Sequence, residues 1–324
     1  MSSEGIEATG GISFSWQRFL RVWGTLIGFV LLLVLFTALR PDAFGTLTNI
    51  RNVVEQVATL AIASAGVTMV MVTGDFDLSV GAVASLVGVI VAKLMVAGVS
   101  VGPAILVGLG AGAAMGAVNG LIIAYAGVSP FVGTLAAMTS YTGLALFTTS
   151  GTTVFGLGES FRWFGQGSVG PLPASVVIMA AVILAVWVVL DYTTFGQRLY
   201  AIGGNREAAF LAGINTKRAR FVAYVISGLT AAVAGIVLTS RLFSAHPQAA
   251  APYMLNAAAA VFLGMTAFRE GQANIFGTFL GVLIMGVLSN GLNIVGVNTY
   301  IQSVLTGAIL VLAVLLSGLA RRSE

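Results

Sequence analysis

The sequence predicts an all-α, polytopic membrane protein with about ten transmembrane helices and with both termini in the cytoplasm. Hydrophobic residues make up 58% of the 324-residue chain and charged residues only 8%, whereas a soluble domain carries about 25% charged residues. The mean hydropathy is +1.01. The apolar residues are grouped in runs of about 20, the length at which a helix crosses the ~30 Å hydrocarbon layer. These observations place the chain in a lipid bilayer.

The first expected helix, residues 20–39, follows a short polar cytoplasmic tail, residues 1–19. Its apolar run is a full span rather than the short core of a signal peptide, and no convincing cleavage site follows it. The further expected spans are residues 53–72, 79–97, 103–125, 131–150, 174–190, 221–241, 254–267, 275–295 and 300–319. Span 254–267 is short for a crossing, and it is either a full span or a broken or re-entrant helix buried among the others. Residues 20–320 thus form a single transmembrane domain.

The basic residues set the orientation of these spans. With the N-terminus in the cytoplasm, ten of the 15 Lys and Arg residues fall on the cytoplasmic side, as the positive-inside rule requires. The net charge of +4 is therefore a feature of membrane topology, because most of the basic residues flank apolar runs rather than cluster on one soluble face. On the same ground we expect no nucleic-acid partner.

One long polar stretch, residues 191–220, interrupts the apolar second half of the chain on the cytoplasmic side. It contains the signals of a two-turn helix: a break at Gly203 and Gly204, an N-cap at Asn205, a first-turn carboxylate at Glu207 and an end at Gly213. So short a helix is only marginally stable in water and needs a surface to lean on. Phe210, Leu211 and Ile214 offer apolar contacts to that surface. We therefore expect a docking helix on the cytoplasmic face.

A second polar motif, GDFDLS, begins at Gly74 and lies between the second and third spans on the cytoplasmic side. Asp77 or Ser79 can cap the third span, since acidic and hydroxyl groups suit a helix N-terminus. The alternative for Asp75 and Asp77 is a role in gating or in contact with another subunit. The residues alone leave both interpretations open.

Glycines recur at helical spacing in two spans and predict close helix packing, because small residues let backbones touch inside a membrane. They are Gly108, Gly112, Gly116 and Gly120 in span 103–125, and Gly277 and Gly281 in span 275–295. The packing is either static or a sliding interface between moving helices. The same two spans share a faint Met-Gly…Asn-Gly-Leu…Gly-Val pattern, which predicts a five-plus-five repeat with halves of opposite orientation.

Several strings of the sequence resemble one family, the ribose- and arabinose-type permeases of bacterial ABC sugar importers. They are GDFDLSVGA (74–82), NGLIIAYAGVSPFVGTLAAM (119–138), TTFGQRLYAIGGNREAAFLAGI (193–214), SGLTAAVAGIVLTSR (227–241) and SNGLNIVGV (289–297). They occur in the family's order and extend the resemblance over roughly residues 20–319. GMTAFREGQAN (264–274) departs from it, with Phe268, Arg269 and Glu270 where many members have small residues. This difference concerns the substrate subclass.

The resemblance implies a permease of the bacterial inner membrane that imports a monosaccharide by alternating access. It also implies separate cytoplasmic ATPase subunits that bind ATP and Mg²⁺, a periplasmic sugar-binding protein and a second permease copy, so that this chain is no enzyme and holds no cofactor. The cytoplasmic helix becomes the ATPase-coupling segment, with Gly203, Gly204, Asn205, Glu207, Ala208, Phe210, Leu211, Gly213 and Ile214 as its residues. By the same resemblance, GDFDLS is a signature segment of the family. The expected external loop 151–173 either receives an external partner or lies on the membrane surface as an amphipathic piece.

Other function classes fit the residues less well. A carrier driven by an ion gradient should bury ionisable groups in mid-span, and this chain has almost none there. No GxxxxGK[ST] loop is present, so any ATPase is a separate chain. With no Cys and a single His, the sequence has no thiol catalyst and no imidazole cluster for zinc, and no nucleophile–base set is visible. A permease for another small polar solute, such as a nucleoside or a branched-chain amino acid, remains the alternative to a sugar permease.

Overall fold

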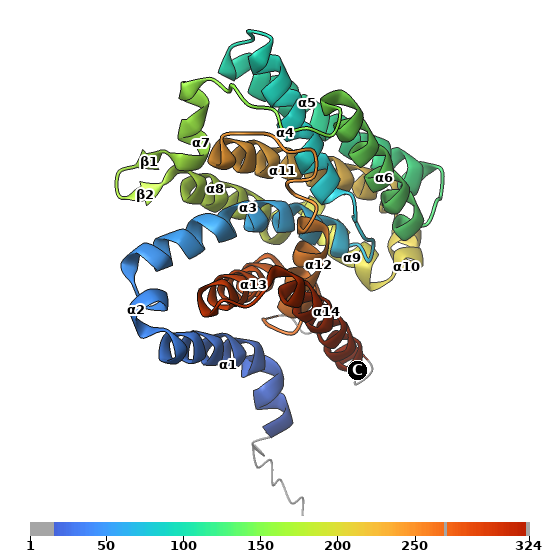
Figure 1. The fold of residues 1–324 in the computed structure, drawn as a ribbon. Coiled ribbons are helices and arrows are strands. Elements are labelled where there is room, and N and C mark those ends of the chain that lie inside the picture. Colours follow the sequence, from blue (N-terminus) through green and yellow to red (C-terminus); the bar gives the residue numbers. More distant parts are fainter. Residues whose placement is uncertain (1–15, 269–270, 322–324) are drawn as a thin grey trace, which may run out of the picture.

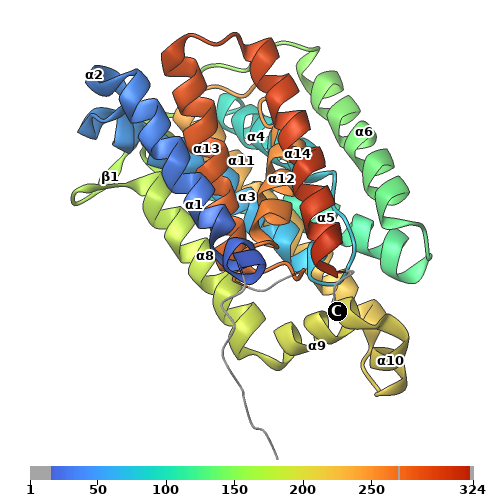
Figure 2. The ribbon, with the colours of Figure 1, turned by 90° about the horizontal axis from the view of Figure 1, so that it is seen from below.

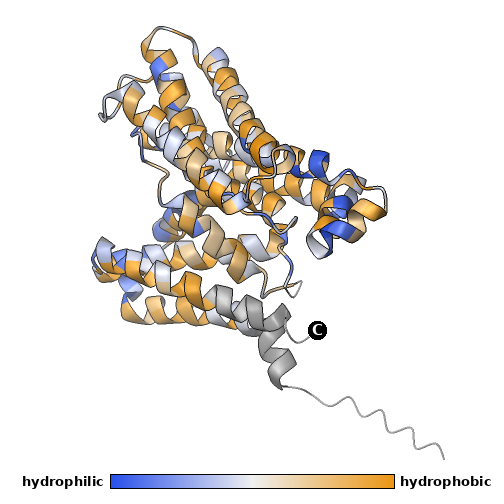
Figure 3. Ribbon diagram, turned by 90° about the vertical axis from the view of Figure 1, so that its right-hand side faces the viewer, coloured by the Kyte–Doolittle hydropathy of each residue, from blue (hydrophilic) through white to orange (hydrophobic). Residues whose placement is uncertain are grey.

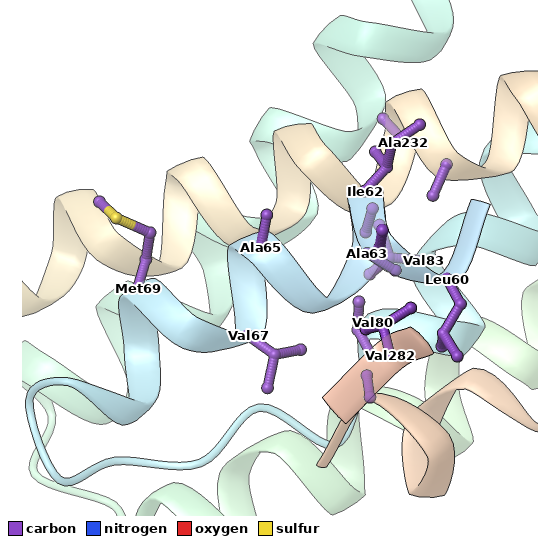
Figure 4. Close-up of a cluster of buried hydrophobic side chains, with 14 of the residues drawn as sticks. Leu60, Ile62, Ala63, Ala65, Val67, Met69, Val80, Val83, Ala232 and Val282 are labelled. Carbon is purple, nitrogen blue, oxygen red and sulfur yellow. The ribbon is translucent and has the colours of Figure 1, made fainter. Parts of the chain in front are cut away.

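Helix α3 (Leu47–Met71) runs through the middle of the protein in a computed structural model that describes residues 16–268 and 271–321 (Figure 1). Every residue from 57 to 71 is buried. A helix that is apolar and buried on all sides belongs in the core of a bundle. It packs against α11 (Thr216–Leu242), α13 (Ile275–Val295) and α8 (Ala174–Tyr192). Figure 4 shows apolar side chains of α3, α4, α11 and α13 meeting in this core.

The remaining helices surround this centre and are joined mostly by short loops. They are α1 (Trp16–Leu39), α2 (Pro41–Phe44), α4 (Val80–Val96), α5 (Val101–Gly120), the π-helical turn η1 (Leu121–Tyr125), α6 (Pro130–Thr149), the 3₁₀ turn η2 (Glu159–Arg162), α7 (Trp163–Gln166), α9 (Thr194–Gly204), α10 (Arg206–Leu211), α12 (Tyr253–Gly264) and α14 (Thr299–Arg321). A two-stranded hairpin, β1 (Ser168–Val169) and β2 (Leu172–Pro173), lies before α8.

Each of the ten expected spans coincides with one main helix of the structure. Six helices in the described residues are long and apolar enough to cross a membrane: α3, α5 together with η1, α6, α8, α11 and α13. α4 and α12 are shorter apolar helices, and so are the described apolar parts of α1 and α14. The all-α, multi-helix membrane fold predicted from composition and hydropathy is confirmed.

Helix α12 occupies the short span 254–267. Its 12 residues extend about 18 Å, which is less than the ~30 Å of the hydrocarbon layer. It is packed among α3, α13 and α14, and non-helical chain lies on both sides of it. Nearby, Phe268 is exposed, and Arg269 and Glu270 lie outside the described residues. The short helix buried among others matches the broken-helix alternative.

Hydropathy divides the protein along its length (Figure 3), with hydrophilic segments at the two ends and hydrophobic ribbon between them. At one end α9 and α10 project from the bundle, and the C-terminal end of α14 and the first turns of α1 lie toward the same end (Figure 2). Residues 1–15 of the expected cytoplasmic tail lie outside the described residues.

Loop 151–173, which is expected to be external, is anchored to the C-terminal end of α11. Phe161 is fully buried, and its carbonyl oxygen accepts a hydrogen bond from Ser240 Oγ at 2.5 Å. The amide of Gly165 donates to the same Oγ at 2.7 Å. Residue Val154 pairs with Ala245 in an isolated antiparallel bridge. The loop is therefore held on the bundle rather than lying free on its surface.

Candidate functional site

The polar segment after α8 folds into two short helices, each started by a side-chain cap. Thr193 accepts a hydrogen bond from the amide of Gly196 at the start of α9, and Asn205 Oδ1 accepts one from the amide of Ala208 at 3.0 Å at the start of α10. Asn215 then caps α11 through the amide of Arg218. An unpaired amide at a helix start costs stability, so these caps fix where each helix begins.

The short helix expected in the polar segment is present as α10, with two differences around it. The chain stays helical through Gly203 and Gly204, and α9 ends at Gly204, so the break falls at Asn205 rather than at the glycine pair. Helix α9 itself has no counterpart in the sequence prediction. Glu207 lies in the first turn of α10, and Gly213 follows the helix with a φ of 82°.

The apolar side chains of α10 and of the turn that follows it differ in burial. Ala209 is buried, Ile214 is half-buried and Ala208 is exposed. Phe210 is 66% exposed and Leu211 is 78% exposed. Two large apolar side chains thus stand on a six-residue helix at the polar, projecting end of the molecule. This arrangement is typical of a surface that another molecule covers.

Asp75 joins this segment to the bundle. It lies in the loop between α3 and α4, after Gly74 turns the chain with a φ of 79°, and it is 1% exposed. Its Oδ1 pairs with Arg206 Nη2 at 2.7 Å, and its Oδ2 pairs with Arg220 Nε at 2.6 Å. Arg206 is the first residue of α10, and Arg220 lies in the second turn of α11. One carboxylate therefore bridges two helices that are distant from it in sequence.

Asp77 lies in the same loop and is held by a different set of partners. Its Oδ1 accepts hydrogen bonds from the amide and hydroxyl of Ser79 at 3.0 and 2.7 Å, and its Oδ2 accepts one from Ser227 Oγ of α11 at 2.7 Å. Ser79 Oγ in turn accepts from Asn119 Nδ2 at 2.8 Å, and Tyr141 donates to Asn119 Oδ1 at 3.2 Å. A buried hydrogen-bonded chain thus connects the loop to α11, α5 and α6.

The expected capping role of Asp77 and Ser79 is not what the structure has. Ser79 stands at the N-cap position of α4, but its side chain makes no capping hydrogen bond. Asp77 bonds the amide of Ser79 itself rather than an amide inside the first turn of α4. The physical reason is competition: side-chain donors from α5 and α11 reach these oxygens and satisfy them.

A second contact ties the coupling segment to the loop at the end of α3. A Cβ atom built on Gly203 would overlap the carbonyl oxygen of Val72, whereas one on Gly204 would meet nothing within 4 Å. Backbone packs directly on backbone at Gly203, so only glycine fits there.

The glycines that predict helix packing lie on contact faces. On α5, Gly112 faces Ala232, Gly116 faces the backbone of Tyr224, and Gly120 faces Phe221, all on α11. The fourth, Gly108, faces Val91 of α4, and on α13 Gly277 and Gly281 meet Gly264 and Ala260 of α12. The two Asn residues of the faint repeat both make side-chain hydrogen bonds, Asn119 as above and Asn290 with Asn49 at 3.0 Å. Whether the halves have opposite orientation stays a prediction.

Sequence reasoning missed the partners of the two aspartates: Arg206, Arg220, Ser227, Asn119 and Tyr141. One signal was present, because the topology already placed Asp75 and the basic residues 206–220 on the same side of the membrane. Within the described residues, no group of three or more acidic or histidine side chains is arranged to hold a metal ion.

Comparison with known proteins decides the family. The family described as "Branched-chain amino acid transport system / permease component" matches residues 49–314. The chain belongs to this permease family. The matched range contains the Asp75–Asp77 loop, the whole coupling segment and all six packing glycines.

Curated relatives match nearly the whole length of the permease. It is 44% identical over 297 residues to the ribose import permease protein of Bacillus subtilis (strain 168), covering 90% of this chain and 91% of that protein. It is 39% identical over 295 residues to the ribose import permease protein of Escherichia coli (strain K12), covering 90% and 92%. With the D-allose transport system permease protein of the same strain, the identity is 34% over 314 residues, covering 97% and 96%. No solved structure matches the chain significantly.

Proposed function

We propose that this chain is the membrane-spanning subunit of an ABC importer for a monosaccharide, in a bacterial inner membrane, and that separate ATPase subunits dock on α10. The observation that carries the docking assignment is the exposure of Phe210 and Leu211, 66% and 78%, on a capped helix at the projecting polar end. A buried aromatic anchor at an interface contributes roughly 2 kcal/mol or more, about thirtyfold in affinity.

The sugar assignment draws on the relatives. Ribose import permeases of two bacteria share 44% and 39% identity with this chain over nine-tenths of its length, and an allose permease shares 34%. Ribose is therefore the first substrate to test. A branched-chain amino acid, which the family description names, is the second.

The proposed mechanism is alternating access driven from outside the chain. ATP and Mg²⁺ bind to the ATPase subunits, whose closure displaces α10 and opens the bundle from one side to the other. A periplasmic sugar-binding protein delivers the substrate at the opposite end, where loop 151–173 is held firmly on α11. A second copy of the permease completes the translocation path.

The distribution of buried charge favours this reading over a carrier driven by an ion gradient. Among the residues whose burial the structure describes, the buried charged side chains are Asp75, Asp77 and Arg220. All three lie at the end of the bundle that carries the coupling segment, and none lies in the middle of a span. A proton- or sodium-coupled carrier needs ionisable groups there.

The test uses the permease reconstituted in vesicles with its partner ABC ATPase and its binding protein. Uptake of radiolabelled ribose should require ATP, and unlabelled allose, arabinose and leucine serve as competitors that identify the substrate class. Phe210→Asp should remove the ATPase from the purified complex and abolish uptake, while the permease still inserts in the membrane.

The matched control is Phe155→Asp, the same change at a phenylalanine that is 69% exposed in the external loop. It should leave ATPase recovery unchanged. Normal ATPase recovery and normal ATP-driven uptake in Phe210→Asp would refute the docking assignment. Uptake that an ion gradient drives without the ATPase would refute the importer.

A further inference from the structure

We propose that Asp75 is the positioning residue that transmits movement of the docking helix to the transmembrane bundle, with Arg206 as the link that carries it. This inference rests on the proposed function, because it assumes that an ATPase moves α10. It concerns what happens after docking, and it assigns a separate role to residues that do not belong to the exposed apolar surface.

The two ion pairs of Asp75 differ in burial, and this difference assigns their roles. Asp75 and Arg220 are 1% and 9% exposed at their side chains, so their pair is closed off from water. Breaking a buried pair leaves an uncompensated charge in a low dielectric, so this pair stays formed and fastens the loop to α11. The Arg206 side chain is 47% exposed. Its pair with Asp75 is the weaker one, and it can respond to what happens on the surface.

Arg206 is also well placed to receive the movement. It is the first residue of α10 and stands about one helical turn, roughly 5 Å, from Phe210. A displacement of Phe210 therefore reaches Arg206 through a single turn of helix. From Arg206 it passes to Asp75 through one charge-assisted hydrogen bond of 2.7 Å.

The loop that receives this displacement is connected to four helices of the bundle. Two residues after Asp75, Asp77 is hydrogen-bonded to Ser227 of α11 and to Ser79 at the start of α4. Ser79 is bonded to Asn119 near the end of α5, and Asn119 to Tyr141 of α6. Tyr224 of α11 also donates to the carbonyl oxygen of Phe76 at 3.0 Å. A shift of the loop thus acts on α4, α5, α6 and α11 together.

The backbone contact between Gly203 and Val72 supports the same assignment independently. It places the end of α9 against Val72, the residue that follows α3 and begins the same loop. The coupling segment therefore touches the loop at two points, one on each side of Asn205. Movement of α10 toward the loop and movement away from it are therefore both transmitted to the loop.

The decisive experiment compares Arg206→Gln with Arg206→Lys and Arg218→Gln in the reconstituted complex. Arg206→Gln removes the link but leaves the buried Asp75–Arg220 pair in place, so the permease should still fold. ATPase recovery should stay as in the wild type, and sugar uptake per ATP hydrolysed should fall about tenfold, a typical size for lost coupling between two sites. Arg206→Lys keeps the charge and should retain most of the sugar uptake per ATP hydrolysed.

Arg218→Gln is the matched control, since Arg218 is an exposed arginine of the same cytoplasmic segment. An unchanged ratio in Arg206→Gln overturns the inference. An equal loss in Arg218→Gln also overturns it, because the effect is then one of general charge. Loss of the ATPase from Arg206→Gln would place Arg206 in the docking surface and overturn the inference too, while leaving the importer assignment in force.

A second pair of variants tests the backbone contact. Gly203→Ala inserts a methyl group against the Val72 carbonyl and should lower the ratio of uptake to ATP hydrolysis, whereas Gly143→Ala in α6 meets open space and should not. Equal ratios in the two variants would contradict transmission at this contact. Failure of the proposed function would be seen in the wild type itself, as a complex that contains no ATPase.

Discussion

Replacing Gly116 with alanine should weaken the packing of α5 on α11, whereas the same change at Gly110 should not. A Cβ at Gly116 would overlap the backbone carbonyl of Tyr224 and crowd the Cα of Val225, but a Cβ at Gly110 would meet nothing within 4 Å. The atoms in the way belong to helical backbone and cannot turn aside as a side chain can. The two helices must therefore separate.

The expected change in the free energy of unfolding follows from two opposing effects. Overpacking of a close contact costs about 1–3 kcal/mol. Alanine gains up to about 1 kcal/mol over glycine in a helix, and this gain is common to both positions. Gly110→Ala should therefore be neutral or slightly stabilising, and Gly116→Ala should be destabilising by up to about 2 kcal/mol.

The assay is thermal unfolding of the purified permease in detergent, followed by the fraction that remains monodisperse after heating. We expect the midpoint of Gly116→Ala to fall by a few degrees and that of Gly110→Ala to stay or rise. Gly116→Leu, with a branched side chain at the same contact, should lower the yield of folded protein further. Equal midpoints for the two alanine variants would refute tight packing at this face.

Two further predictions concern topology and the end of the docking helix. The chain has no native cysteine, so single cysteines can be labelled selectively. Asn205→Cys should react with a membrane-impermeant thiol reagent only from the cytoplasm, and Ser168→Cys should react only from outside. Labelling of both variants from the same side would contradict the orientation. Gly213→Val should lower sugar uptake at an unchanged level of bound ATPase, because its φ of 82° strains a β-branched residue. Gly213→Asn tolerates that φ and should retain uptake; equal loss in both variants would show that strain at this position is not the cause.

The spanning helices and the short helix α10 could be predicted because their signals are local. Runs of about 20 apolar residues imply spanning helices, since lipid leaves no other partner for the backbone. Asn205 and Gly213 mark the two ends of α10 through contacts within a few residues, and the structure has the cap and the positive φ at these positions. Helix α9 was not predicted because the sequence pattern of a glycine pair indicates a helix break. In the structure, Gly203 instead serves the close packing of backbone against Val72.

The partners of the two aspartates were decided by the tertiary structure. Asp75 meets arginines that are 131 and 145 residues away in the chain, and Asp77 meets a serine 150 residues away. Capping was a reasonable expectation from sequence alone, because it needs only neighbouring amides. Long-range donors displaced it once α5 and α11 had packed beside the loop. The sequence by itself determined that this is a helical membrane protein with a short capped helix in its polar segment. The packing of distant helices decided what the buried carboxylates hold together, because an ion pair forms only where the fold brings its two charges into contact.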